Sequence, residues 1–396
     1  MVESSDELSE PKDEPREQPL KTQADLVIRK FERLDLYNFA SPTDTPIDIS
    51  IERLRSKQDL LTRLCSSILP QIQHQCARLS RLLQEPTHLH NNPASTLKLI
   101  WEIQLNLELT LGQMIQTLDE IFPGRVPEPY QKRDQRFNEL KIYRLHRLNS
   151  SLRVDLKSRL RILFQNSIKL IEDFKLPVAE RRRVIEFADL GINRKIELAI
   201  KYVRGSELSL IWELWKDGIN SLSRQVAVLL RQMDPIRALH PKGESHLSQP
   251  AIKLGRSVLP IFKLSRLFFK KLYRENVKME EVELFTEMCS HQLFCLHSSI
   301  EDIIESISVL SFSVRDADRL APGDTSSAII QELNKLIVLF QPHLSLINLY
   351  VLPNMFPNHT GLSRQIDFQN WVVDWTNSFL LATHNAIQAV QSFADT

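Results

Sequence analysis

The sequence predicts an all-α protein, with about ten helices in antiparallel bundles behind an acidic N-terminal tail. Apolar residues recur every three to four positions along almost the whole chain, which is the period of an amphipathic helix. The chain contains only 9 glycines and 20 prolines, too few glycines for the turns of an all-β protein. Its 396 residues are enough for two or three domains, each with a core of its own.

Residues 1–21 are expected to form a disordered tail, because they contain seven acidic residues, three prolines and almost nothing apolar. A first helical bundle is predicted over residues 22–204. Its helices are expected at 22–40, 50–84, 93–122, 131–174, 178–190 and 193–203. Pro70 should kink the second of these helices, and Pro93 follows a capping Asn92 at the start of the third.

A second bundle is predicted over residues 205–396, either separate from the first or packed with it as one continuous unit. Its helices are expected at 206–233, 251–275, 280–314, 325–351 and 362–393. The weakly patterned residues 234–250 are the best candidate for a flexible connection. Four tryptophans fall at helical spacing within apolar faces and are therefore expected in the core: Trp212, Trp215, Trp371 and Trp375.

Residues 251–275 separate charge from hydrophobicity more cleanly than any other stretch. Seven apolar residues fall within one arc of this helix: Leu254, Val258, Ile261, Phe262, Phe268, Phe269 and Leu272. Seven basic residues lie mostly on the other side and form a candidate interaction surface: Lys253, Arg256, Lys263, Arg266, Lys270, Lys271 and Arg274. No acidic residue occurs between Glu244 and Glu275. Pro260 should kink this helix or split it into two.

Two interpretations of this helix remain open. It is either a core helix with a solvated basic face, or an element that binds a protein partner or an anionic membrane surface. A second basic row, formed by Arg153, Lys157 and Arg161, is predicted on the helix at 131–174. A charged outer face is the simpler interpretation of that row.

Two groups of side chains have some features of a metal site. Cys289, His291, Cys295 and His297 lie close together in the sequence, but on a helix only His291 and Cys295 point the same way. A closed zinc site needs four convergent ligands. Glu301, Asp302 and Glu305 have the spacing with which helical enzymes bind magnesium and an isoprenoid diphosphate, but a second metal-binding triad is missing from the sequence.

The chain also contains no HExxH, GxSxG or P-loop motif. We therefore expect no catalytic residues, no metal, no cofactor and no enzymatic activity. A magnesium-dependent isoprenoid-diphosphate enzyme is the alternative.

Composition sets expectations for partners and compartment. A formal net charge of +1 gives no general reason to expect nucleic acid as a partner, and the aromatic residues lie on faces opposite the charge. The N-terminus lacks the pattern of a signal peptide, and no uninterrupted apolar run approaches a membrane span. The four cysteines are not spaced like a disulfide framework. We expect a cytoplasmic protein, with the nucleus or unconventional secretion as alternatives.

Six segments resemble a large family of helical proteins expanded in rust fungi such as Puccinia and Melampsora. They are NNPASTLKLIWEIQ (91–104), GSEL (205–208), KLSRLFFKKL (263–272), TEMCSHQL (286–293), NWVVDW (370–375) and THNAIQA (383–389). The resemblance implies a fungal helical protein, intracellular or delivered to a host, and it assigns no activity or site residue. In size and bundle architecture the chain is also similar, more distantly, to cyclin-D-binding and vinculin-like proteins, which implies function through a protein partner.

The sequence therefore predicts a non-enzymatic interaction or adaptor protein with an unknown protein partner. The alternative is a peripheral protein that binds anionic membranes through residues 251–275.

Overall fold

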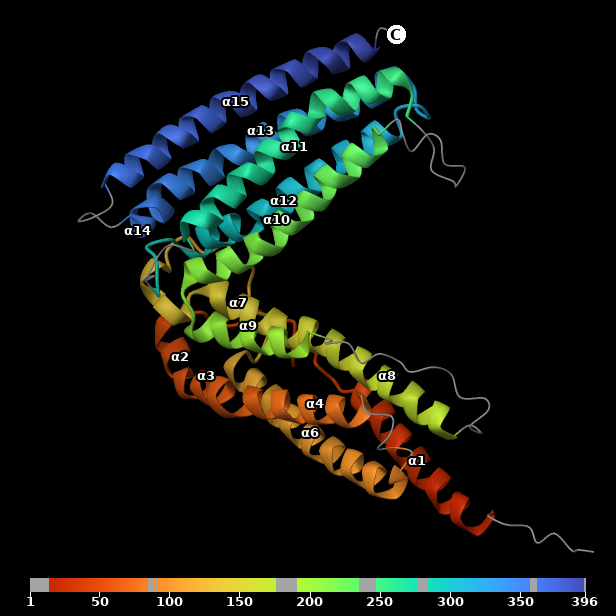
Figure 1. Cartoon of the computed structure of the whole chain (residues 1–396). Coiled ribbons are helices and arrows are strands. Elements are labelled where there is room, and N and C mark those ends of the chain that lie inside the picture. The colour runs from red at the N-terminus through yellow and green to blue at the C-terminus, as the bar shows by residue number, and fades with distance from the viewer. Residues whose placement is uncertain are drawn as a thin grey trace, which may run out of the picture. The chain divides into compact units, whose positions relative to one another are not determined.

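The structure is a computed structural model that describes residues 14–84, 89, 91–175, 191–234, 247–276, 284–356 and 362–394. Within these ranges the chain is all-α, as predicted, with no β-strand and one isolated bridge between Pro46 and Arg125 (Figure 1). The chain divides into two compact units. The N-terminal unit comprises residues 1–128 and 144–203, and the C-terminal unit comprises residues 129–143 and 204–396. The predicted division at 204/205 had placed 129–143 in the first bundle.

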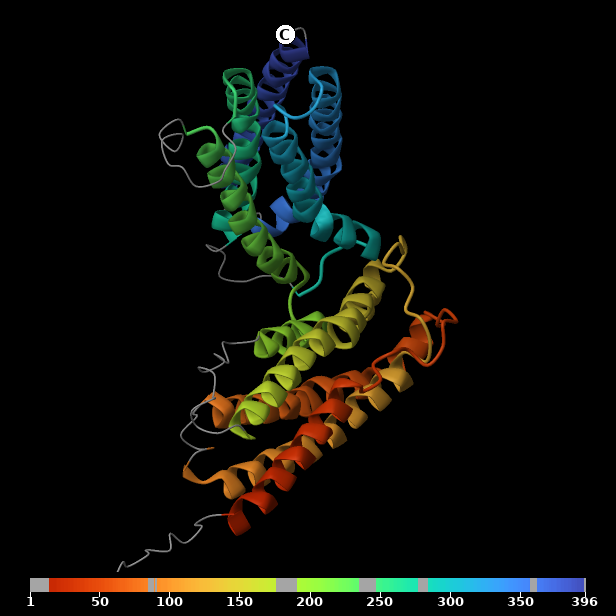
Figure 2. The same cartoon turned by 90° about the vertical axis from the view of Figure 1, so that its right-hand side faces the viewer.

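The N-terminal unit is built on four long helices, α1 (Glu14–Asp35), α4 (Leu69–Gln84), α6 (Pro93–Ile121) and α8 (Lys157–Lys175). α1 packs against α6 and α8, and α4 packs against α6 (Figure 2). Shorter helices complete the fold: α2 (Ile51–Arg55), α3 (Gln58–Arg63), α7 (Ile142–Ser150) and α9 (Ile192–Arg204). The first two residues of α7 belong to the C-terminal unit. The predicted helix at 178–190 lies outside the described residues.

α1 begins earlier and ends earlier than the sequence pattern predicts. It starts at Glu14, so residues 14–21 of the expected disordered tail are helical, and it ends at Asp35 instead of near residue 40. Residues 1–13 of the predicted tail lie outside the described residues.

Prolines shape two of the helices through wide π-helical turns. The predicted helix at 50–84 is broken, and a π-helical turn at Leu64–Ile68 directly precedes α4, whose second residue is Pro70. The same arrangement recurs where the turn Ile347–Val351 precedes α14 (Leu352–Met355), which contains Pro353. A proline lacks the amide donor and its ring crowds the preceding turn, so a wider turn relieves both problems.

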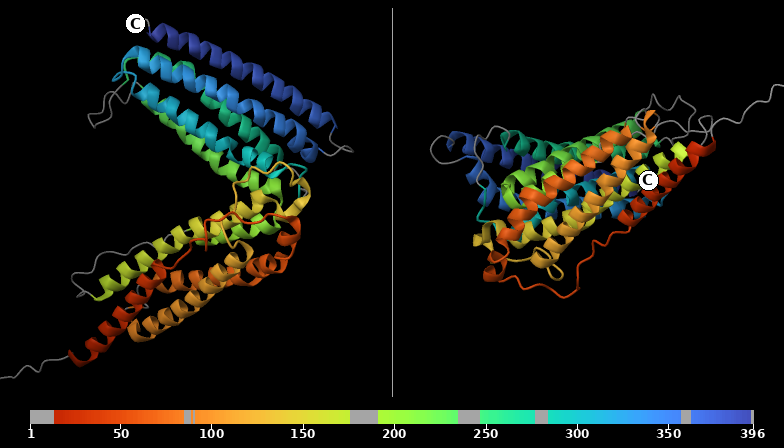
Figure 3. Two further views of the ribbon diagram at one scale, coloured as in Figure 1. Left: turned by 180° about the vertical axis from the view of Figure 1, so that it is seen from behind. Right: turned by 90° about the horizontal axis from the view of Figure 1, so that it is seen from below.

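Five long helices form the C-terminal unit: α10 (Glu207–Gln232), α11 (Gln249–Asn276), α12 (Ser290–Arg315), α13 (Pro322–Leu346) and α15 (Leu362–Ala394). α10 packs against α11, α11 against α15, α15 against α13, α13 against α12, and α12 against α10, which closes a ring (Figure 3). Most of the predicted connection at 234–250 lies outside the described residues.

α11 supplies the centre of the C-terminal core. All seven apolar residues of its predicted arc are buried. Phe268 and Phe269 join an aromatic cluster in which the ring centroids of Phe268 and Trp375 are 4.6 Å apart and those of Phe269 and Trp215 are 5.1 Å apart. Trp212, Trp215 and Trp375 are buried, and Trp371 packs against this core, so the prediction of core tryptophans is confirmed.

Pro260 does not split α11, so that part of the prediction is wrong. The residue is exposed, and the amide that it lacks would have bonded to the carbonyl of Arg256 on the same outer side. Water can reach that carbonyl, which lowers the cost of the missing hydrogen bond.

Candidate interaction surface

The basic side chains of α11 form a row along its outer face, which we call the α11 stripe (Lys253, Arg256, Lys263, Arg266, Lys270, Lys271 and Arg274). Five of the seven residues are exposed, while Arg266 and Lys271 are half-buried. Spacings of three, four and seven residues, as in the series 253–256–263–270–274, keep the row on one side of the helix. It extends over about 32 Å, at a rise of about 1.5 Å per residue.

The α11 stripe is largely unneutralised. Lys271 Nζ lies 3.2 Å from a carboxylate oxygen of Glu275, four residues further along the same helix. The other six basic side chains form no ion pair with any acidic residue in the described part of the chain. Leu267, which is 46% exposed, and Pro260 are the apolar members of this face. The stripe is therefore a solvent-facing row of positive charge with one leucine near its middle.

The second basic row does not form a comparable surface. Arg153 is 6% exposed, and its guanidinium donates hydrogen bonds to the carbonyls of Phe39 (3.0 Å) and Ala40 (2.8 Å). The same guanidinium donates to a carboxylate oxygen of Asp119 at 2.6 Å. Arg153 thus fixes the loop after α1 to α6, and its place in a surface row is a wrong prediction.

The other two members of that row also contact the end of α1 or the loop after it. The Lys157 ammonium lies 5.8 Å from the ring centroid of Phe39. Arg161 Nε lies 3.4 Å from a carboxylate oxygen of Asp35, the last residue of α1. Lys157 and Arg161 are nevertheless exposed, as expected for a charged outer face, and only Arg153 is buried. A pattern of basic residues at helical spacing does not distinguish such internal contacts from a free surface.

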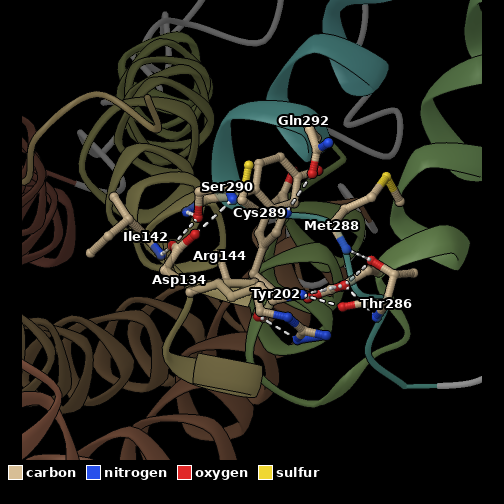
Figure 4. Close-up of polar contacts among 12 residues, drawn as sticks. Asp134, Ile142, Arg144, Tyr202, Thr286, Met288, Cys289, Ser290 and Gln292 are labelled. Atoms are coloured by element: carbon tan, nitrogen blue, oxygen red, sulfur yellow. Dashed lines mark hydrogen bonds and ion pairs between the residues drawn. The ribbon is translucent and has the colours of Figure 1, made fainter. Parts of the chain in front are cut away.

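A buried polar cluster in the C-terminal unit was not predicted from the sequence. It consists of Asp134, Lys141, Glu207, Thr286 and Ser290. Figure 4 labels Asp134, Thr286 and Ser290. Lys141 Nζ lies 3.0 Å from Glu207 Oε1 and donates a 2.7 Å hydrogen bond to the carbonyl of Thr286. Glu207 Oε2 accepts hydrogen bonds from the amide and hydroxyl of Thr286, at 2.8 Å and 2.7 Å.

Asp134 lies at the N-termini of two helices at once. Its Oδ2 accepts a hydrogen bond from the amide of Ile142, the first residue of α7, at 3.0 Å. Its Oδ1 accepts one from the amide of Ser290, the first residue of α12, at 2.8 Å. The Ser290 hydroxyl donates to the same carboxylate and accepts a 2.7 Å hydrogen bond from the amide of Tyr143. One carboxylate thus binds amides that the two helices cannot pair internally.

The arrangement of this cluster is structural. Its carboxylates are occupied by backbone amides, hydroxyls and the Lys141 ammonium, so no acid or base is left exposed to a substrate. The sequence carried one signal for it: Glu207 lies in GSEL, and Thr286 and Ser290 lie in TEMCSHQL, two of the segments on which the rust-fungal resemblance rests.

In the N-terminal unit, a buried arginine binds the end of α9. Arg144 is fully buried, and its Nη1 donates hydrogen bonds to the carbonyls of Tyr202 (3.0 Å) and Val203 (3.3 Å) (Figure 4). These carbonyls belong to the last turn of α9, which leaves such groups without intrahelical partners. Arg144 therefore caps the C-terminus of α9 with a positive charge.

The cysteine and histidine residues near the start of α12 make separate contacts. His291 and Cys295 are adjacent, with Sγ 3.8 Å from Nε2, as their spacing predicts. His297 instead accepts or donates a 2.7 Å hydrogen bond at Nδ1 with the hydroxyl of Tyr143. No group of three or more His, Cys, Asp or Glu side chains suited to a metal ion occurs among the residues described.

The acidic residues of α12 are on its outer part. Glu301 and Glu305 are exposed, and Asp302 is half-buried. Partial burial raises the pKa of the Asp302 carboxyl, and the neighbouring Glu305 raises it further, while a hydrogen bond from Ser298 opposes the shift.

One described helical stretch, Pro322–Met355, is long and apolar enough to cross a membrane by length and composition. It is not an uninterrupted apolar run, because Asn, Gln, Ser and Pro residues interrupt the stretch. Its inward side packs against α12 and α15 in the core of the C-terminal unit.

Two domain families match adjacent parts of the chain. Residues 57–204 match a domain of unknown function (DUF8723), and residues 206–388 match a second domain of unknown function (DUF8721). The predicted division at 204/205 falls between the two matches, while residues 129–143, which complete the C-terminal unit, lie within the first. No curated protein matches the chain. The matches are consistent with a protein family to which no activity is assigned.

Proposed function

We propose that this protein is a non-enzymatic interaction protein that binds an acidic protein partner through the α11 stripe. The observation that carries the proposal is the row itself: six basic side chains without an ionic partner among the described residues, along about 32 Å of one helix. Charge complementarity at such a surface would raise association rates and select against basic partners.

The burial of α11 favours a protein partner over a membrane. An amphipathic helix binds a bilayer by inserting its apolar face, and here Phe262, Phe268 and Phe269 are at most 1% exposed. Among the described residues of α11, Leu267 is the one large apolar side chain that is exposed and could insert. A straight row of charges at three-, four- and seven-residue spacing instead suits an acidic helix lying alongside α11. Binding to anionic lipid remains the alternative and would be electrostatic.

The test is a quantitative affinity pull-down from the native cell with the whole protein and a charge-reversed variant, Lys263→Glu/Lys270→Glu. We expect a bound protein that is lost in the variant and is weakened by salt. The matched control is Lys216→Glu/Arg224→Glu, which reverses two exposed charges on α10. Partners that bind the variant and the wild type equally would contradict the proposal.

A second experiment distinguishes a protein partner from a lipid surface. Vesicles that contain phosphatidylserine are sedimented with the wild type and with Lys263→Glu/Lys270→Glu. Binding to these vesicles that the variant abolishes, without a stripe-dependent protein partner, would favour the membrane alternative.

We also propose that the protein has no enzymatic activity. The acidic residues Glu301, Asp302 and Glu305 are the part of the chain that an isoprenoid-diphosphate enzyme would use to bind magnesium. Turnover of an isoprenoid diphosphate that is lost when all three are changed to Ala would establish the enzyme alternative instead.

We further propose a cytoplasmic protein of the rust-fungal family that the six segments resemble. Three of the cysteines, Cys65, Cys76 and Cys289, are buried as free thiols. Burial raises the pKa of the Cys76 thiol to about 12, which makes it a poor nucleophile. Buried free thiols support a reducing compartment. Fractionation of the native cell tests the compartment.

A further inference from the structure

The outer face of α13 and α15 is poor in charge. These helices are 25 and 33 residues long and contain six charged residues in all: Asp324, Glu332, Lys335, Arg364, Asp367 and Asp374. No charged residue occurs from Trp375 to Ala394, although a quarter of the whole chain is charged. Depletion of charged residues is the compositional mark of the centre of a protein interface.

Exposed apolar residues lie on this face at regular spacing. Ile366, Val373 and Leu380 follow one another at seven-residue intervals along α15, and they are 48%, 57% and 45% exposed. Leu381 on α15, at 61%, and Val338 on α13, at 65%, are exposed as well. Between the three members of the seven-residue series lie exposed uncharged polar residues, Asn370 and Asn377.

We propose that this face forms a homodimer, in which α15 packs antiparallel against α15 of a second copy. Residues at seven-residue intervals lie on one side of a helix, so these three apolar residues form a line against which a second helix can pack. A two-fold axis that passes near Asn377 would bring Val373 opposite the partner's Leu380, and the reverse. The proposal goes beyond the function proposed for α11, because it uses a different face of the C-terminal unit.

Charge and area favour a second copy as the occupant. The charged residues of α15 (Arg364, Asp367 and Asp374) all precede Asn377, and an antiparallel arrangement about Asn377 places them opposite the uncharged stretch from Trp375 to Ala394 of the second copy, so like charges do not directly oppose each other. α13 is about 37 Å long, and helices pack about 8–10 Å apart, so the two helices present roughly 700 Å². A stable interface buries about 800 Å² per partner. A bilayer is less suitable, since the amides of Asn370 and Asn377 would lose their hydrogen bonds in hydrocarbon.

Sedimentation velocity of the whole protein tests the proposal. We expect a dimer for the wild type, and for Val373→Lys and Leu380→Lys we expect dimerisation weakened by about a hundredfold, because a charge is then buried in the seam. Both residues are exposed and lysine favours helix, so the fold is retained, which far-UV circular dichroism verifies. The matched control is Leu109→Lys on α6, where the leucine is 64% exposed.

A cross-link tests the predicted axis. Asn377→Cys should form a disulfide-linked dimer when oxidised glutathione accepts the two electrons, whereas Arg224→Cys, exposed on α10, should not. The wild type reports any cross-link from the native cysteines. A monomeric wild type at all concentrations would overturn the proposal and leave the face to a different protein. A dimer that neither Val373→Lys nor Leu380→Lys weakens would overturn it equally.

Discussion

Lys141 and Glu207 form an ion pair with no access to solvent: Nζ and Oε1 are 3.0 Å apart, and both side chains are 0% exposed. The pair links the segment 129–143 to the first residue of α10. Two charges buried in this way must satisfy each other, because neither can be hydrated. The Thr286 carbonyl accepts a hydrogen bond from Lys141, and the Thr286 amide and hydroxyl donate to Glu207.

Lys141→Met should therefore destabilise the C-terminal unit by about 3–5 kcal/mol, since it removes the ammonium that lies 3.0 Å from the buried Glu207 carboxylate. Urea unfolding followed by tryptophan fluorescence measures the change. The control is Lys195→Met, which breaks a partly exposed 2.8 Å ion pair with Asp155 and should cost less than about 1 kcal/mol. Equal losses of unfolding free energy in the two variants would mean that the buried ion pair stabilises the fold no more than the partly exposed one does.

Asp134→Ala should loosen the starts of α7 and α12 together, because one carboxylate accepts hydrogen bonds from the first amide of each helix. We expect a loss of about 2 kcal/mol, the upper end for removal of a helix cap. Amide hydrogen exchange should accelerate in the first turns of both helices. The control is Asp324→Ala, in the exposed first turn of α13. If amide exchange in the Asp134 variant accelerated in only one of the two helices, the shared cap would be refuted.

Gly218→Ala should destabilise α10 against α12. A Cβ atom at this position would lie 2.3 Å from Cδ1 and 2.6 Å from Cγ1 of Ile300, so the helices would have to move apart. Overpacking of this kind costs about 1–3 kcal/mol. Ile300→Ala removes the clashing atoms, so the double variant should be more stable than the two separate losses predict.

Gly323→Ala is the matched control for that experiment. Nothing lies within 4 Å of the Cβ that it would add, near the start of α13. Thermal unfolding should show little change, or a small gain from the better helix former. A comparable loss of stability in this variant would mean that helix propensity, and not the contact with Ile300, explains the effect at Gly218.

His343 should make stability fall at acidic pH. Burial lowers the pKa of this imidazole to about 4, and neither ring nitrogen has a hydrogen-bond partner among the described residues. As the pH falls, His343 therefore binds a proton near pH 6.5 in the unfolded chain but only near pH 4 in the folded chain. Above pH 6.5 this group does not lower the free energy of unfolding. Between pH 6.5 and 4 the free energy of unfolding falls progressively, by about 3 kcal/mol in total.

His343→Leu should flatten the dependence of unfolding free energy on pH within that window, relative to the wild type. The measurement is urea unfolding at intervals between pH 4 and 7. His74→Leu, which removes an exposed imidazole from α4, controls for the substitution itself. An unchanged slope in the His343 variant would show that other groups cause the acid sensitivity.

Local periodicity predicted most of the long helices and their buried faces, but not all of their bounds: the helix expected at 131–174 is α-helical only from Ile142, and the one expected at 280–314 begins at Ser290. In α11 the apolar arc from Leu254 to Leu272 is buried and Lys263 and Lys270 are exposed, because the helical repeat alone decides which side a residue takes. The π-helical turn at Leu64–Ile68 was beyond such reasoning, since periodicity does not report the width of a turn.

Contacts between distant residues could not be predicted in the same way. Lys141 and Glu207 are 66 positions apart, and in the sequence each resembles an ordinary surface charge. Arg153 was assigned to a surface row for the same reason, although the carbonyls that bind it belong to a loop more than 110 positions earlier. Burial of a charge depends on partners that only the folded chain brings together.

The segment 129–143 also sets an order of events during synthesis. Lys141 is made 145 residues before Thr286, whose carbonyl it binds. At roughly 5–20 residues per second, the ribosome needs about 7–30 s to make the intervening chain. Glu207, the other partner of Lys141, is made 66 residues after it, and Tyr202, whose carbonyl Arg144 binds, is made 58 residues after Arg144. Lys141 can therefore pair with Glu207 within that interval, but it gains the Thr286 carbonyl only at the end of it.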